Sequence, residues 1–335
     1  MQHIQHKIQR VLALLFCLCV LPVTASAKVS VLATVPEWGA LAQEIGGERV
    51  DIFTATSARQ DPHRIEARPS LIARARNADL LIATGAELEI GWLPVLLRES
   101  GNTRIQPGQP GHLEAAGEVV LRDVPQAVDR SMGDVHAAGD PHFHLDPHNI
   151  LPVAAALTER LARIDPAGVE TYRSNLARFR TRWQEALVRW EAAGAKLKGT
   201  PFLQVHRSFG YLAHWLGLVS RGELEPKPGI EPGSAHLSRI VTAQQTSPAA
   251  LILRAAYQDE TAGRWVAERA QIPLVTLPFT VGGTPEAKDL FSLFDDTLAR
   301  LEKAAGNVEY SKNSPIPPRG GGAGGEGVFT SGRTP

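Results

Sequence analysis

One long helical stretch interrupts a regular alternation of short apolar runs and amphipathic segments. Between residues 166 and 198 apolar side chains recur at spacings of three and four, which predicts one continuous helix of about nine turns. These side chains are Val169, Tyr172, Leu176, Phe179, Trp183, Leu187 and Trp190. On both sides of the stretch, strand-like runs alternate with helical segments, the pattern of parallel sheets with helices on both faces. The sequence therefore predicts two α/β lobes joined by one rigid helix.

The predicted strands indicate where a ligand can bind. Before the long helix the apolar runs cover residues 29–34, 50–54 and 79–84, and after it residues 201–205, 251–253 and 274–277. The helical segments cover residues 38–45, 69–77, 208–216, 262–270 and 287–304. Ligands of such sheets bind beyond the carboxyl ends of the strands, so the residues that follow a strand are the first candidates for a site.

Histidine is concentrated in a repeated tripeptide. Asp-Pro-His occurs at residues 61–63, 140–142 and 146–148, and His206 follows another predicted strand. Proline fixes its own φ and keeps the preceding residue out of the helical region, so each imidazole is presented from a turn of restricted geometry. Neutral imidazole is the commonest nitrogen ligand of zinc and its neighbours. The pattern favours a metal site, although turns that end in histidine also occur on ordinary surfaces.

The first 27 residues have the features of a secretory signal peptide. Lys7 and Arg10 precede an apolar run at residues 11–21, and the small residues at 25–27 match a signal-peptidase site. The run is short for a transmembrane helix, and bulky residues precede both cysteines, unlike a lipoprotein signal. We therefore expect cleavage near Ala27 and a soluble, periplasmic mature protein that starts near Lys28.

Cleavage at this point removes Cys17 and Cys19, the two cysteines of the chain. The mature protein then has neither a disulfide nor a thiolate ligand, so any metal is held by nitrogen and oxygen. Removal of Lys7 and Arg10 from the 35 basic residues leaves 33 against 35 acidic residues, a formal net charge of −2. This balance gives no support to a nucleic-acid partner or an anionic membrane surface.

These features divide the chain into five expected parts. They are a signal peptide at residues 1–27, an N-terminal α/β lobe at 28–165, a linker helix at 166–198, a C-terminal α/β lobe at 199–305 and a tail at 306–335. The tail lacks apolar periodicity and contains a glycine-rich run, so we expect it to be disordered. A helical link limits the lobes to small movements, unlike a glycine-serine hinge.

Several short motifs stand in a characteristic order from about residue 31 to residue 301. They are Ile45-Gly46-Gly47, Asp61-Pro62-His63 with Glu66, Ala78-Asp79-Leu80, Gly85-x-Glu87-Leu88-Glu89, Asp140-Pro141-His142 with Leu145-Asp146-Pro147, Ile164-Asp165-Pro166 with Tyr172 and Asn175-Leu176, and His206 with Phe209-Gly210-Tyr211. The chain thereby resembles the metal-binding solute receptors of bacterial ABC importers, which capture zinc or manganese. The resemblance implies two lobes with a metal site in the cleft between them. It also implies a monomeric carrier, not an enzyme, that delivers its ion to an inner-membrane ABC permease with a cytoplasmic ATPase.

Carried over position by position, the resemblance implies that His63, His142 and His206 are the histidine ligands. The family's usual fourth ligand is a carboxylate in an Asp-Pro pair after a late strand, where this chain has Leu277-Pro278. Arg254 lies near a position where related receptors often carry glutamate. Three imidazoles without a carboxylate favour zinc over manganese, because manganese is better served by oxygen ligands. Water or a further side chain remains for the fourth position.

Three more histidines are candidates for that position. His136, His144 and His148 lie in or next to a stretch that resembles a short version of the histidine-bearing loop of zinc receptors. His144 is two residues from His142, so in an extended segment both side chains point to the same side. We expect a packed or surface position for His214 on its apolar segment, and nothing beyond residue type supports the histidines at 112 and 236.

Carboxylates near the histidines are candidates for a supporting role. Metal-bound imidazole commonly donates its other N–H to a carboxylate, and Asp61, Glu66, Asp140 and Asp146 are near enough in sequence to accept it. For Asp146 we favour a plain turn cap.

Two other classes of protein are weaker alternatives. A secreted zinc hydrolase also uses three ligands and a water, but the chain has no His-Glu-x-x-His helix and no evident general base beside its histidines. A receptor for a siderophore or cobalamin, or an adhesin on the same scaffold, is the second alternative. Such large ligands need a wide cleft lined with aromatic and arginine side chains, whereas the histidine set suits a bare ion. A manganese receptor of the same type is the nearest alternative.

Overall fold

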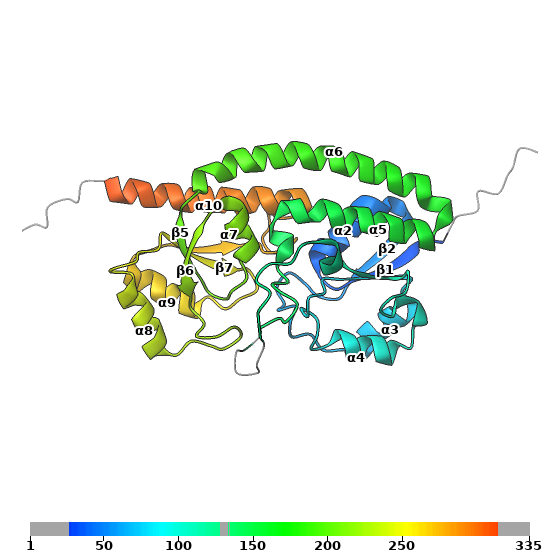
Figure 1. Cartoon of the computed structure of the whole chain (residues 1–335), viewed down its shortest axis with the longest axis horizontal. Coiled ribbons are helices and arrows are strands. Elements are labelled where there is room, and N and C mark those ends of the chain that lie inside the picture. The colour runs from blue at the N-terminus through cyan, green and yellow to red at the C-terminus, as the bar shows by residue number, and fades with distance from the viewer. Residues whose placement is uncertain (1–26, 128–132, 134, 314–335) are drawn as a thin grey trace, which may run out of the picture.

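Two α/β lobes lie side by side, and one long helix runs along the same side of both (Figure 1). The computed structural model describes residues 27–127, 133 and 135–313. Each lobe contains a four-stranded sheet whose strand pairs are all parallel. The predicted fold class, two parallel-sheet lobes joined by a long helix, is therefore confirmed.

The N-terminal lobe has the strand order β2-β1-β3-β4. Its strands are β1 (Val29–Ala33), β2 (Val50–Thr54), β3 (Leu80–Ala83) and β4 (His112–Glu114), and its helices are α2 (Pro36–Gly46), α3 (Pro69–Asn77), α4 (Leu93–Ser100) and α5 (Ile150–Ile164). Successive residues of β1 face opposite sides of the sheet, so Val31 packs in one apolar cluster and Leu32 in another, with α3 and α4. Helices therefore cover both faces, as predicted. The sequence analysis missed α4, α5 and β4.

The C-terminal lobe repeats the arrangement with the order β6-β5-β7-β8. Its strands are β5 (Pro201–Gln204), β6 (Val219–Glu223), β7 (Leu251–Ala255) and β8 (Leu274–Leu277), and its helices are α7 (Gly210–Leu216), α8 (Ser234–Ala243), α9 (Thr261–Ala270) and α10 (Leu290–Asn313). Helix α10 continues past residue 306, where the tail was expected to begin. The rest of that tail and residues 1–26 of the expected signal peptide lie outside the described residues.

The connecting helix α6 (Val169–Gly194) is shorter than the nine turns that periodicity predicts, because 3-10 turns at Pro166–Gly168 and Ala195–Leu197 form its two ends. Two of its buried tryptophans donate hydrogen bonds, one to each lobe. The indole N–H of Trp183 donates to the Pro147 carbonyl at 2.9 Å, and that of Trp190 donates to the Asp295 carboxylate of α10 at 2.6 Å. One apolar core thus continues through both lobes, which supports a rigid link.

Two of the sequence motifs fasten α6 to the N-terminal lobe. The Asp165 carboxylate accepts from the Tyr172 hydroxyl at 2.6 Å and from the Arg49 guanidinium at 2.7 Å. The Asn175 side chain donates to the Ile45 carbonyl at 2.8 Å. These motif residues therefore have a structural task at a distance from the histidines.

Candidate metal centre

His63 is held in a small closed turn that follows β2. The Asp61 carboxylate lies 3.0 Å from the His63 backbone nitrogen and 2.7 Å from its ring Nδ1. Trp92, just before α4, donates its indole N–H to the Pro62 carbonyl at 3.0 Å. The turn and its histidine are thereby fastened to the N-terminal lobe.

His142 and His206 are supported by carboxylates in a similar way. Asp140 holds His142 at the same two distances, 3.0 Å and 2.7 Å. His206 follows β5, and its Nδ1 donates to the Glu225 carboxylate at 2.6 Å, which also accepts the Gly229 N–H at 2.8 Å. The sequence analysis missed Glu225, because it follows the unpredicted strand β6 and lies far from His206 along the chain.

The three histidines converge from both lobes. Each offers a ligand atom, and these atoms lie within 4.8 Å of one another. A carboxylate only accepts, so each bonded Nδ1 carries the ring proton and Nε2 keeps a lone pair. Nε2 of His63 and of His142 is buried and has no hydrogen-bond partner. His63, His142 and His206, the histidine trio, could hold a transition-metal ion whose fourth coordination position remains open.

The electrostatics favour the metal-binding protonation state. Burial lowers the pKa of His142 to about 4, and the opposing effect of Asp140 does not cancel it. Burial acts to raise the pKa of Asp61 and of Asp140, but the imidazoles to which they are bonded outweigh it and lower both values. Neutral imidazole beside ionised carboxylates is the state that coordination requires. Of the expected supporting carboxylates, Asp61 and Asp140 bond the rings, whereas Glu66 is exposed.

His136 lies beside the trio. Its ring stacks on that of His63, with centroids 5.3 Å apart and planes at 26°, and its centroid is 6.4 Å from that of His142. Its Nε2 is buried without a hydrogen-bond partner, and burial lowers its pKa to about 4. It does not belong to the group whose ligand atoms lie within 4.8 Å.

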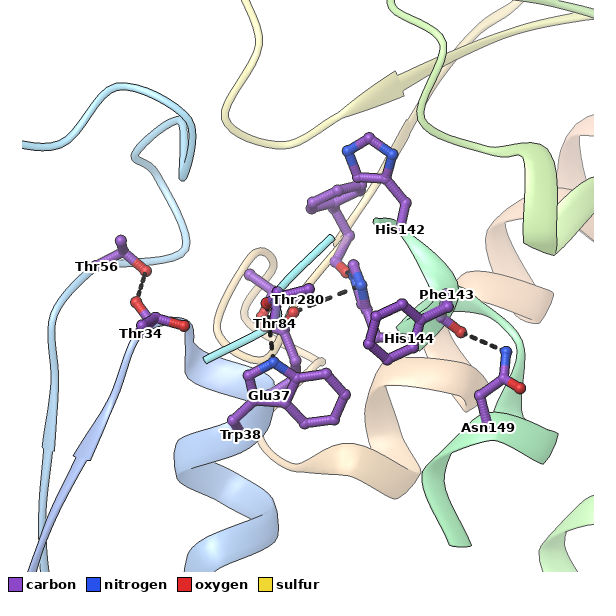
Figure 2. A network of polar contacts seen from close by, with 12 residues as sticks. Thr34, Glu37, Trp38, Thr56, Thr84, His142, Phe143, His144, Asn149 and Thr280 are labelled. Atoms are coloured by element: carbon purple, nitrogen blue, oxygen red, sulfur yellow. Dashed lines mark hydrogen bonds and ion pairs between the residues drawn. The ribbon is translucent and has the colours of Figure 1, made fainter. Parts of the chain in front are cut away.

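His144 is not brought to the trio. Residues Phe143–Leu145 form a 3-10 turn instead of the extended segment that we assumed, so His144 points away from His142 (Figure 2). Its Nε2 lies 3.0 Å from the Phe279 carbonyl, and its Nδ1 lies 3.5 Å from the Glu37 carboxylate. The His144 ring therefore lies in a buried contact between the lobes, which the sequence did not reveal.

His148 is also separate from the trio, on the surface. Asp146 lies 2.7 Å from its Nδ1 and caps the turn as expected, while Glu191 of α6 lies 3.1 Å from its Nε2. His214 is exposed on α7, and the histidines at 112 and 236 are not part of the group either.

The chain turns sharply after β8, where the resemblance led us to look for a carboxylate. Phe279 has a φ of 67°, unusual for a bulky residue, and its ring packs 5.7 Å from that of His142. Arg254 instead donates to the Thr276 hydroxyl of the neighbouring strand at 2.9 Å. Within the described residues, no carboxylate joins the histidine group.

Residues 31–304 match the model of the family described as zinc-uptake complex component A, periplasmic, or ZnuA. The chain belongs to this family. ZnuA proteins are periplasmic metal-binding receptors of transport systems and not enzymes, in agreement with the prediction from sequence. None of the described helices combines the length and apolarity needed to cross a membrane.

The names of proteins similar to this chain refer to zinc in some cases and to manganese in others. The chain is 22% identical to the zinc-binding lipoprotein AdcA of Streptococcus pneumoniae over 64% of its length, but spans only 43% of that protein. It is 22% identical to the manganese ABC transporter substrate-binding lipoprotein PsaA of the same species, over 84% of this chain and 90% of PsaA. The structure of FpvC from Pseudomonas aeruginosa in complex with Mn2+ covers 85% of this chain and 99% of its own, with a TM-score of 0.67 and 17% identity, which shows a shared fold.

Proposed function

We propose that this chain captures a divalent transition-metal ion, zinc by preference, in the periplasm and delivers it to an ABC permease driven by a cytoplasmic ATPase. The observation that carries the proposal is the convergence of His63, His142 and His206, with ligand atoms within 4.8 Å of one another. Membership of the ZnuA family supports the transport role. The ion is cargo, and no chemistry is done on it.

The donor set supports zinc over manganese. Asp61, Asp140 and Glu225 each bond the Nδ1 of a histidine, so they orient the rings from behind. The ion is then offered imidazole nitrogen, which suits zinc, whereas the harder manganese ion prefers oxygen. The family description names zinc, while the relatives PsaA and FpvC are named for manganese.

We further propose that the two lobes move only slightly when the ion binds. Residues 28–165 and 199–305 form the two lobes, residues 166–198 link them, and the mature monomer begins after Ala27. The continuous core beneath α6 supports a small settling of the lobes around the ion in place of a wide closure. His206 comes from one lobe and His63 from the other, so a bound ion bridges them.

Metal binding is tested on mature protein made without a polyhistidine tag and stripped with a chelator. We expect each chain to bind one zinc ion and to prefer zinc to manganese in competition with a chromophoric chelator. Zinc at about 100 times its dissociation constant should raise the unfolding free energy by roughly 2.7 kcal/mol. A melting curve that excess zinc leaves unchanged would refute the metal function.

The ligand assignment is tested by single substitutions. His63→Ala, His142→Ala and His206→Ala should each weaken zinc binding severely. His214→Ala is the matched control, since this exposed histidine of α7 is not part of the group. Wild-type zinc affinity in the three site variants would overturn the assignment.

A further inference from the structure

We propose that His136 is the fourth ligand of the bound ion and replaces the carboxylate that the late strand does not supply. The inference rests on the proposed function, because it needs an ion at the three other histidines. It makes the coordination shell entirely imidazole nitrogen, which strengthens the preference for zinc over manganese.

The position of His136 is close to that of a ligand. Its ring centroid lies 5.3 Å from that of His63 and 6.4 Å from that of His142, while the centroids within the trio are 5.8, 6.0 and 6.2 Å apart. His136 therefore stands at this spacing from two members of the trio, and ligation requires an inward shift that brings its ligand atom to the group. A cavity of about 60 Å³ lined by His136, His142 and His206 has room for this shift, since a water needs only about 10–15 Å³.

The chemistry of His136 demands a partner. Its Nε2 is buried without a hydrogen bond, and burial of a polar atom costs free energy until a bonding partner compensates it. Nε2 of His63 and Nε2 of His142 are in the same state, and they belong to the rings beside it. One shared cation satisfies all three nitrogens at once, whereas a hydrogen bond among them satisfies at most two.

Contacts outside the site place the segment that carries His136. The Ala137 backbone N–H donates to the Glu87 carboxylate of the N-terminal lobe. On the other side, Gly133 lies so close to the C-terminal lobe that a Cβ there would be 2.3 Å from the Pro228 carbonyl oxygen. The described residues of the segment thus touch both lobes, and ligation by His136 would tie the segment to the ion that bridges the lobes.

The late-strand turn does not compete for the fourth position. The Phe279 side chain is an apolar ring packed on His142, and its carbonyl oxygen lies 3.0 Å from Nε2 of His144. Neither group of Phe279 offers an oxygen to the ion. Among the groups that the structure describes, His136 and water are then the candidates for the fourth position.

X-ray absorption at the zinc edge distinguishes these two ligands. In zinc-loaded wild-type protein we expect scattering from four imidazoles, and in His136→Ala from three imidazoles and one oxygen. The variant should bind zinc at least about tenfold more weakly. His136→Asp, which returns an oxygen ligand, should shift the zinc-to-manganese affinity ratio toward manganese. His148→Ala, a histidine from the exposed Asp-Pro-His turn, is the matched control and should keep wild-type values.

A wild-type spectrum with three imidazoles and one oxygen would overturn the assignment of His136. So would a His136→Ala variant with unchanged zinc affinity and spectrum. The alanine variants at 63, 142 and 206 are measured in the same series. If they lose zinc while His136→Ala does not, only the fourth ligand is wrong; if they too retain zinc, the proposed site itself fails.

Discussion

Two copies of Asp-Pro-His, at residues 140–142 and 146–148, have the same local geometry in different surroundings. In each, the aspartate lies 3.0 Å from the histidine backbone nitrogen and 2.7 Å from Nδ1. His142 has 2% of its side chain exposed and lies in the histidine group, whereas His148 has 49% exposed and lies against Glu191. The tripeptide thus produces an oriented imidazole in either place, and only residues from distant segments make one of them a candidate ligand.

The largest difference in zinc affinity is expected between the two variants that each lose one of these imidazoles. His142→Ala removes a direct ligand, so zinc affinity should fall by more than the roughly 10- to 100-fold that loss of an outer partner costs. His148→Ala should leave zinc affinity unchanged. Chelator competition on both variants measures the difference, and equal losses would mean that the two turns are equivalent after all.

In metal-free protein the two histidines should respond to pH with opposite signs. The folded pKa of His142 is about 4, below the ordinary 6.5, so the unfolded chain binds more protons between these values. Through this group the unfolding free energy falls as pH is lowered from 6.5 to 4, by on the order of 3 kcal/mol. For His148, partial burial is outweighed by Asp146 and Glu191, which raise its pKa. Its small contribution is full below pH 6.5 and is lost as pH rises through the raised pKa.

Urea unfolding of chelated protein at a series of pH values checks these signs. His142→Asn should flatten the decline in unfolding free energy between pH 6.5 and 4, whereas His148→Asn should leave it in place. A wild-type acid decline in His142→Asn would contradict the prediction for the buried ring.

Replacing the aspartates should give a smaller contrast. Asp140→Asn weakens the acceptor that fixes the proton and orientation of His142, and the expected loss of zinc affinity is about 10- to 100-fold. Asp146→Asn removes the same contact from His148 and should not change zinc binding. If calorimetric titration finds no loss in Asp140→Asn, the carboxylate only shapes the turn.

The smallest effect is expected at Glu191, the partner of His148. This ion pair is half exposed, so Glu191→Gln should change the unfolding free energy by less than about 1 kcal/mol and leave zinc affinity intact. Thermal and urea unfolding measure the change. A loss of zinc binding would show that the surface turn is coupled to the site.

Much of the fold could be predicted because its signals are local. Apolar runs indicated β1, β2, β3, β5, β7 and β8, and helical periodicity indicated α6. The missed strand β6 has the sequence Val-Ser-Arg-Gly-Glu and lies at the sheet edge beside β5. It therefore lacks the apolar run by which the other strands were predicted. β4 has three residues at the other lobe's edge. Such edge strands are specified by their neighbours more than by their own composition.

The site was predictable in part. His63, His142 and His206 are brought together as predicted, and Asp61 and Asp140 bond the rings as the sequence suggested. The predicted side-chain direction of His144 was wrong, because the prediction assumed an extended segment where the chain forms a 3-10 turn. The contact of Glu37 with His144 and the packing of Phe279 join segments whose proximity no local pattern indicates.

The sequence by itself determined the two lobes, the long amphipathic helix and the three rigid Asp-Pro-His turns, since periodicity and turn chemistry depend on neighbouring residues alone. Only the tertiary structure decided which imidazoles meet. Packing of the lobes beneath α6 brings His63 and His142 to His206 and leaves His148 on the surface. The physical reason is that a metal site needs side chains from distant segments within a few ångströms of one point, and the folded core sets those distances.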